Sequence, residues 1–302
     1  VISSFIHAIL WIPLLLIPQM ILSGLLFSFE KLNNLISTKG KVPIVADVMA
    51  SRWAYEAMAT YQFKSNDYET PYYDYEKGES QADFKAAYMA DELQRRNRFA
   101  LENFESKNDS IKKLVNGHLK IIHDVLVQEP FKPGFEKINL DEALSLEKYS
   151  KNMGMLLSGY LEQYRGHYQK IYNDNVSLIE KKMAFYEKSG FNINEEKNKY
   201  HNESLADLVK NITTKNRLIE YNGKLVQQIN PIFQDPKPSG ILDYRTAFFL
   251  PEKNLLGLTV STFIFDLVII WLMSLGLYIA LYFEWVRKLV DSFGKVNIPK
   301  RK

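Results

Sequence analysis

The sequence predicts an all-α membrane protein, because its apolar residues are concentrated at the two ends of the chain and its middle has helical spacing. Over all 302 residues, 46% hydrophobic and 24% charged residues with a net charge of +3 are typical of a soluble protein. However, residues 1–29 contain no Asp, Glu, Lys or Arg, and residues 255–283 contain only Asp266. Uncharged runs of about 20 residues or more can cross the roughly 30 Å apolar core of a bilayer. These two runs exclude a freely soluble enzyme.

The composition excludes several further classes of protein. The chain contains no cysteine, which rules out a disulfide scaffold, a thiol nucleophile and a cysteine-based metal or iron–sulfur site. A near-neutral charge without a basic tract gives no indication of nucleic-acid binding. The chain begins at Val1, inside an apolar run that lacks the basic segment and cleavage site of a signal peptide. We therefore expect further helices or domains upstream of it.

Residues 1–29 form the first predicted spanning segment. Pro13 and Pro18 remove backbone donors, so we expect a kinked segment or two broken pieces. At the other end of the chain, residues 284–302 contain six basic residues and two acidic ones. Because short basic flanks stay on the cytoplasmic side, we expect a cytoplasmic C-terminal tail. The first segment then runs outward, and residues 30–254 are extracytoplasmic.

A second apolar stretch, residues 49–63, is too short and too charged to span a bilayer, yet too apolar for a free loop. Its Arg52 and Glu56 are four residues apart, so they lie on one face of a helix and can neutralise each other. We predict an interfacial or re-entrant helical region over residues 30–64, with Trp53 and other aromatic side chains at the membrane surface.

Residues 65–254 are predicted to form a helical extracytoplasmic domain. Apolar residues at spacings of three and four indicate helices, and Gly190 is expected to end the longest of them. The two longest helices predict an antiparallel hairpin over residues 141–229, about 50 Å or more in length at 1.5 Å per residue. We expect no alternating strand pattern and no internal repeat. The predicted segments are an aromatic and acidic loop at 66–80, helices at 81–103, 107–128, 141–188 and 195–229, and a linker with Pro and Gly at 231–240.

The last predicted spanning segment, residues 255–283, is continuous and is bounded by Tyr278, Tyr282 and Trp285. Asp266 is about three turns into it, at a depth where a carboxylate is costly and faces protein or a polar partner. Three interpretations of Asp266 remain open. It makes an interhelical hydrogen bond or salt bridge, or it acts in coupling or substrate contact, or the segment slips so that it lies near the interface.

Catalytic side-chain patterns are absent from the sequence, which contains no HExxH, P-loop, GxGxxG or GxSxG motif. We therefore predict no catalytic residue and no metal site, and we interpret the histidines and acidic pairs as surface or packing residues. Four tyrosines recur every four residues along the longest predicted helix. We expect a packing stripe against residues 195–229 rather than a ligand-stacking surface; the tyrosines are Tyr160, Tyr164, Tyr168 and Tyr172.

A run of small and bulky residues lies at the outer end of the first spanning segment. Ser23 and Gly24 allow close helix approach, and Leu25 and Leu26 then place two large apolar side chains at one level. In a symmetric dimer these leucines could form a dry constriction that gates by excluding water. Generic helix packing explains the run equally well.

Residues 20–27 and the stretch Ser51–Phe63 resemble the permease half of G-subfamily ABC exporters, both in their residues and in their order along the chain. This is the type-two permease group of the white and pleiotropic-drug-resistance transporters. In that family the fifth membrane helix ends in Ser-Gly-Leu-Leu. A re-entrant region follows, with an Arg-aromatic-x-aromatic-x-Ala-Leu pattern closed by an acid or amide and Phe, and the sixth helix returns to a basic cytoplasmic end. The corresponding residues here are Ser23-Gly24-Leu25-Leu26, Arg52-Trp53-Ala54-Tyr55-Glu56-Ala57-Met58 and Gln62-Phe63.

The resemblance implies six membrane helices per protomer in a homo- or heterodimer, of which this chain contains the last two. It also implies that ATP and Mg²⁺ bind to a nucleotide-binding domain outside this sequence, so that this chain is not an enzyme by itself. The implied site residues are Leu25 and Leu26 as a valve between two cavities, Ile17 and Met20 lining the central cavity, and Arg52, Trp53, Tyr55 and Glu56 on the re-entrant helix.

The expected setting is the inner membrane of a bacterium, where the protein would export a lipophilic or lipid-like substrate by alternating access. The expected partners are a second protomer, the nucleotide-binding domain and the lipid bilayer. In the family the loop before the last helix is usually short and often disulfide-bonded, whereas residues 81–229 form a long cysteine-free insertion here. This insertion could cap the exit, or bind a periplasmic or outer-membrane partner.

The alternative is a two-span sensor, receptor or anchor with a helical periplasmic domain. It predicts the same topology, but it leaves the Ser-Gly-Leu-Leu run and the re-entrant stretch unexplained.

Overall fold

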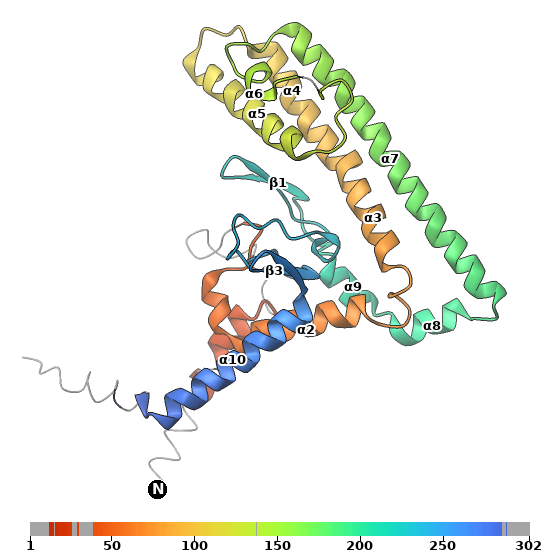
Figure 1. The fold of residues 1–302 in the computed structure, drawn as a ribbon, viewed down its shortest axis with the longest axis vertical. Helices are drawn as coiled ribbons and strands as arrows, with labels where there is room; N and C mark the ends of the chain where they lie inside the picture. The colour runs from red at the N-terminus through yellow and green to blue at the C-terminus, as the bar shows by residue number, and fades with distance from the viewer. Residues whose placement is uncertain are drawn as a thin grey trace, which may run out of the picture. The chain divides into compact units, whose positions relative to one another are not determined.

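The computed structural model describes residues 12–14, 16–25, 29, 39–136, 138–285 and 288. The chain divides into two compact units (Figure 1). The first unit comprises residues 1–60, 237–246 and 252–302, and the second comprises residues 61–236 and 247–251. The described residues are mostly helical, in agreement with the predicted all-α class, but they also contain two short β-hairpins that the sequence analysis does not predict.

The first unit contains helix α10 (Thr262–Tyr282), which alone in the described part of the chain is long and apolar enough to cross a membrane. Only the start of α10 is buried, at Thr262, Phe265 and Asp266. Beyond it, large apolar side chains such as Trp271 are exposed. A shorter apolar helix covers Ile12–Leu22.

The predicted start of the last spanning segment, at residue 255, is wrong. Residues 252–261 form a hairpin of β3 (Glu252–Leu255) and β4 (Leu258–Ser261), and α10 begins only after it. Leu256 and Gly257 connect the strands with φ of 54° and 88°, the positive values that a tight two-residue hairpin turn requires. Asp266 therefore lies about one helical turn from the start of α10 rather than three turns inside a span.

The predicted re-entrant region, residues 30–64, contains a 3₁₀ helix η2 (Ile44–Val48) and helix α2 (Ala50–Lys64), while residues 30–38 lie outside the described part of the chain. In the first turn of α2, the Ser51 hydroxyl donates a hydrogen bond of 3.0 Å to the Gln19 carbonyl. This bond joins the start of α2 to the N-terminal apolar helix within the first unit.

The second unit is a helical layer built on α7 (Lys151–Lys188), whose 38 residues extend for about 57 Å. A rod formed by α3 (Tyr73–Asp83), the π-helical segment η3 (Phe84–Met89) and α4 (Ala90–Asn103) packs along α7, as Figure 1 shows. The remaining elements are α5 (Asp109–Gln128), which packs on α4, and α6 (Leu140–Ala143), α8 (Ile193–Tyr200), α9 (Glu203–Val209), β1 (Leu218–Tyr221), β2 (Lys224–Gln227) and η4 (Pro231–Phe233).

The second arm of the predicted hairpin over residues 141–229 is wrong, since residues 195–229 are not one helix. Asn192 and Asn202 each accept a backbone hydrogen bond as N-caps, so α8 and α9 are separate short helices. The chain then turns at Asn222 and Gly223, both at positive φ, to form the β1–β2 hairpin. The long partner of α7 is instead the α3–η3–α4 rod.

The predicted tyrosine packing stripe is confirmed, although it packs on different elements. Tyr160, Tyr164 and Tyr168 are buried in the core of the second unit, and Tyr172 is partly buried against it. Close approach of α7 to α4 depends on Gly154, because a Cβ there would lie 2.3 Å from Leu101 Cδ2. The core of this unit is therefore a helix–helix interface rich in tyrosine.

Candidate functional site

Five charged side chains gather in the first unit. Arg52 and Glu56 come from α2, Lys253 from β3, Asp266 from the start of α10, and Asp47 from η2. Arg52, Glu56, Lys253 and Asp266 are each at most 2% exposed. Charged residues are almost never buried to this degree unless they are paired, so this cluster is the strongest candidate site in the unit. We call these five residues the charge cluster.

Glu56 is the centre of the charge cluster. Its carboxylate accepts hydrogen bonds from Lys253 Nζ at 2.9 and 3.0 Å, one to each oxygen. Arg52 Nη2 lies 3.1 Å from Glu56 Oε2, across one turn of α2. Lys253 Nζ also lies 3.3 Å from the Thr246 hydroxyl. One carboxylate thus pairs with two cations that come from different elements.

Asp47 forms the second part of the charge cluster. Its carboxylate accepts a hydrogen bond of 2.9 Å from the Tyr244 hydroxyl, and its backbone carbonyl accepts one of 2.8 Å from Trp53 Nε1. Burial raises the pKa of Asp47, while Arg52 and the Tyr244 hydroxyl act in the opposite direction. Burial and the bond to Asp47 also raise the pKa of Tyr244.

Aromatic side chains surround the charges. The Arg52 guanidinium lies over the Trp53 ring, 3.7 Å from its centroid, which is a close cation–π contact. The centroid of the Trp53 ring lies 6.0 Å from that of Phe265 in α10. The Tyr244 ring stacks on Phe265 with a centroid distance of 5.9 Å. These rings exclude water from the ion pairs and so strengthen them.

Asp266 differs from the other carboxylates of the charge cluster. Among the described residues, no donor forms a hydrogen bond with either of its oxygens. Its strongest charge interactions are with Glu56, then with Lys253 and Arg52. The cluster contains three carboxyl groups and two cations, so Asp266 is the carboxyl group for which no cation forms a direct ion pair. A buried polar group without a donor is rare and marks a position to test for function.

The charge cluster is suited to holding segments together rather than to catalysis. It contains no histidine, serine or threonine arranged as nucleophile and base, and among the described residues no group of three or more His, Cys, Asp or Glu could hold a metal ion. The ion pairs connect α2 to β3, next to the buried first turn of α10. Removing one member of such a pair costs about 3–5 kcal/mol, because the other charge is then left buried without a partner.

The structure brings together four of the predicted site residues, namely Arg52, Trp53, Glu56 and Asp266. The others lie elsewhere. Tyr55 is partly buried and burial raises its pKa, whereas Ile17, Met20 and Leu25 are largely exposed, and Leu26 lies outside the described residues.

The residues around Leu25 end the N-terminal apolar helix. The Ser23 hydroxyl donates to the Met20 carbonyl at 2.8 Å and accepts from the Leu25 amide at 3.1 Å. Gly24 follows with φ of 81°. The local turn therefore presents Leu25 to the surroundings, with 57% of its side chain exposed.

Sequence reasoning missed Asp47, Tyr244 and Lys253. Lys253 had a detectable signal, because it is the last cation before a long uncharged run. Nothing in the sequence pairs it with Glu56, which is 197 residues away.

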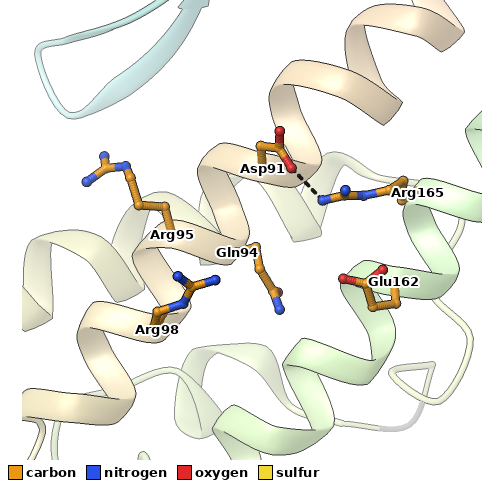
Figure 2. A pocket seen from close by; sticks show the side chains of 6 residues that line it. All are labelled: Asp91, Gln94, Arg95, Arg98, Glu162 and Arg165. Atoms are coloured by element: carbon orange, nitrogen blue, oxygen red, sulfur yellow. Dashed lines mark hydrogen bonds and ion pairs between the residues drawn. The ribbon is translucent and has the colours of Figure 1, made fainter.

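A separate polar groove of about 400 Å³ lies between α4 and α7 in the second unit (Figure 2). Asp91 and Arg165 face each other across it with a contact of 2.5 Å, and Arg95 is paired with Glu92. The groove is open to solvent and its side chains are largely exposed, so these pairs have the weak energies of surface salt bridges. Its lining residues are Asp91, Gln94, Arg95, Arg98, Glu162 and Arg165.

Comparisons of this chain with protein-family models, with curated proteins and with solved structures find no match. The functional argument therefore depends on the residues and their geometry.

Proposed function

We propose that this chain is the C-terminal part of a permease subunit of an ATP-driven exporter that resembles the G-subfamily ABC transporters. In this proposal α10 is the last membrane helix, and α2 belongs to the re-entrant region before it. ATP and Mg²⁺ bind to a nucleotide-binding domain outside these 302 residues. The substrate is lipophilic or lipid-like, and a second protomer completes the translocation path.

The observation that supports this proposal best is the link between α2 and the start of α10. The motif that resembles the exporters, Arg52 to Glu56, is buried by contact with Lys253 and Phe265, immediately before and inside the first turns of the candidate spanning helix. A free amphipathic helix would need no such pairing. A re-entrant helix has to be held at a fixed depth, and in this proposal the buried ion pairs with Lys253 fix the position of α2 relative to the start of α10.

In the proposed mechanism, α2 and α10 move as one body. ATP binding closes the cavity between protomers, and the charge cluster transmits that movement from α10 to α2. The exposed Leu25, at the turn that ends the N-terminal apolar helix, would meet its counterpart in the second protomer. Leu25 and Leu26 would then seal the path between substrate cavities and open outward.

The second unit would lie outside the cytoplasm and cap or extend the exit. Its long hairpin of α7 with the α3–η3–α4 rod is supported by the tyrosine-rich core and has largely polar exposed faces. Its location follows from the basic C-terminal tail and is part of the proposal.

The proposal is tested with the protein expressed from its full reading frame and reconstituted in liposomes that contain a fluorescent phospholipid. We expect vanadate-sensitive ATP hydrolysis and ATP-dependent movement of the labelled lipid between leaflets. Leu25→Ala and Leu26→Ala should change the transport rate per ATP hydrolysed by severalfold. Leu272→Ala, an exposed position on α10, is the matched control and should leave it unchanged. Absence of vanadate-sensitive ATPase activity would refute the exporter proposal, and unaltered transport in both valve variants would refute the valve.

A further inference from the structure

The second unit contains a small cavity of about 130 Å³ with aromatic walls. It lies where the loop before α3 meets the C-terminal end of α7 and the start of α8. Tyr68, Tyr72, Tyr186 and Phe191 provide its rings, and Asp67 and Glu196 provide two carboxylates. Drug-sized sites have volumes of roughly 300–1,000 Å³, so this cavity is suited to a small group. We call it the aromatic cavity.

The rings of the aromatic cavity stand at steep angles to one another. Tyr68 and Tyr72 have centroids 5.7 Å apart at 56°, and Tyr72 and Tyr186 are 6.3 Å apart at 80°. Tyr186 and Phe191 are 5.7 Å apart at 45°. Rings at such angles form the walls of a box rather than a stack, so several ring faces can surround one bound group.

The C-terminal cap of α7 fixes two of these rings. Gly190 has φ of 83°, its amide bonds to the Glu187 carbonyl, and the Phe191 amide bonds to the Tyr186 carbonyl at 3.0 Å. This is the Schellman arrangement, in which the two residues joined by the longer bond also bring their side chains into contact. Tyr186 and Phe191 are therefore held in place by the backbone before any ligand binds.

The loop before α3 positions the Tyr72 ring. The Asn66 side-chain carbonyl accepts from the Glu69 amide at 2.8 Å, and the Tyr72 amide bonds to the Glu69 carbonyl at 2.9 Å. Tyr72 is only 3% exposed. A preformed wall of this kind reduces the entropy that a ligand loses on binding.

The electrostatic environment of the aromatic cavity favours a cation. Aromatic faces are negative, and the two carboxylates add to that potential. Burial raises the pKa of both Tyr68 and Tyr72, and the charges of Glu76 and Glu187 act in the same direction at Tyr68 and Tyr72 respectively. Among the described residues no lysine or arginine lines the cavity. Lys199, which is fully exposed, interacts with Asp67 and Glu196 from outside it.

We propose that the aromatic cavity binds a quaternary ammonium group, such as that of choline. A trimethylammonium group is small, has an apolar surface of methyl groups and carries one positive charge. Aromatic faces and carboxylates together recognise these properties. The group can be offered by a free solute or by a lipid headgroup. This inference does not depend on the exporter proposal.

The test uses the full-length protein in a maltoside detergent, which has no ammonium group. Binding of choline is compared with binding of 3,3-dimethylbutan-1-ol, in which a carbon replaces the charged nitrogen, by saturation-transfer NMR titration. We expect choline to bind about tenfold more tightly. Equal binding of the two compounds would overturn cation recognition, and no binding of either would overturn the site.

Two pairs of variants locate the binding. Phe191→Leu should weaken choline binding about fivefold or more by removing one ring, whereas Phe185→Leu, an exposed phenylalanine that does not line the cavity, should leave it unchanged. Asp67→Asn should weaken choline binding severalfold. Asp74→Asn is the matched control, because Asp74 does not line the cavity. Equal effects within each pair would overturn the assignment to this cavity.

A competition experiment identifies the source of the ammonium group. Vesicles of phosphatidylcholine that displace choline, when phosphatidylglycerol vesicles do not, would support a lipid headgroup as the ligand. Failure of both vesicles to displace choline would support a free solute. The two outcomes therefore distinguish a lipid headgroup from a free solute as the source of the ammonium group.

Discussion

A completely buried amide in the second unit and a completely buried carboxyl group in the first differ in how their hydrogen bonds are satisfied. In the second unit, Asn97 is completely buried, donates to the Gly154 carbonyl and the Ser158 hydroxyl, and accepts from Tyr149. In the first unit, Asp266 is equally buried, and no donor among the described residues bonds to its carboxylate. A satisfied network specifies a packed core, whereas an unsatisfied one is costly and persists where the surroundings hold it.

The exposed surfaces of the two units also differ in polarity. Helix α10 exposes large apolar side chains along most of its length, while α7 exposes mainly polar and charged ones. An exposed apolar face of this size marks a site of contact with lipid or with another protein. The comparison shows that the charge cluster lies at the start of a helix with an apolar exposed face, whereas the tyrosine core supports a helix with a polar one.

The largest expected effect is at the centre of the charge cluster. Glu56→Gln leaves Lys253 and Arg52 buried without their shared counter-ion, so we expect the first unit to lose about 3–5 kcal/mol of stability. Asp266→Asn is the matched change, because it replaces a carboxyl group that lacks a donor with an amide next to Glu56. It should be neutral or stabilising. Thermal unfolding in detergent measures both, and a loss for Asp266→Asn as large as that for Glu56→Gln would contradict the account of the cluster.

A smaller effect is expected at the helix interface of the second unit. Gly154→Ala places a Cβ 2.3 Å from Leu101 and 2.4 Å from the Tyr149 hydroxyl, and overpacking of this kind costs about 1–3 kcal/mol. Gly166→Ala in the same helix has no described atom within 4 Å of the new Cβ. Its higher helix propensity should stabilise α7 by about 0.5–1 kcal/mol. Chemical denaturation separates the two variants, and effects of the same sign would show that α7 does not pack on α4 in this register.

A pH dependence of stability is expected in the second unit. Burial and the neighbouring Glu76 raise the pKa of Glu69 above its usual value near 4.5, although Lys210 and Lys197 oppose this. Glu69 also faces His201 at 3.7 Å, whose pKa is lowered by burial. Because the unfolded chain ionises Glu69 first, the stability of this unit falls as pH rises above about 4.5, by at most about 1.4 kcal/mol per pH unit.

Glu69→Gln should flatten this dependence and raise the stability of the second unit at pH 8. The measurement is a series of thermal midpoints from pH 5 to pH 8. A variant with the same slope as the parent would show that Glu69 is not the group that titrates.

The sequence predicts individual elements well where the signal is local. The uncharged run ending at Phe283 contains α10, and the periodicity of residues 107–128 coincides with α5. The hairpin of β1 and β2 also had a local signal that the helical interpretation overlooked, namely the Asn222-Gly223 pair between short apolar segments. The start of α10 was placed too early because residues 255–261, which include the end of β3, the turn and β4, contain no charged residue, and only Gly257 indicates the turn.

Local sequence patterns do not identify which helices pack together in the tertiary structure. Residues 81–103 and 195–229 both offer apolar faces, and periodicity alone cannot decide which of them packs on α7. In the charge cluster, the four-residue spacing predicted that Arg52 and Glu56 pair. It could not predict that Lys253 and Asp266 approach the same carboxylate, because their separation along the chain contains no spacing signal.

We propose that the two units lie in different environments, the first in the membrane and the second in water outside the cytoplasm. The absence of cysteine from these 302 residues allows a direct test. Ser189→Cys, at the exposed end of α7, and Lys302→Cys, at the end of the tail, are labelled separately with a membrane-impermeant maleimide in bacterial spheroplasts. We predict that residue 189 is labelled in intact spheroplasts and residue 302 only after lysis. Labelling of both positions in intact spheroplasts, or of position 302 alone, would contradict the account.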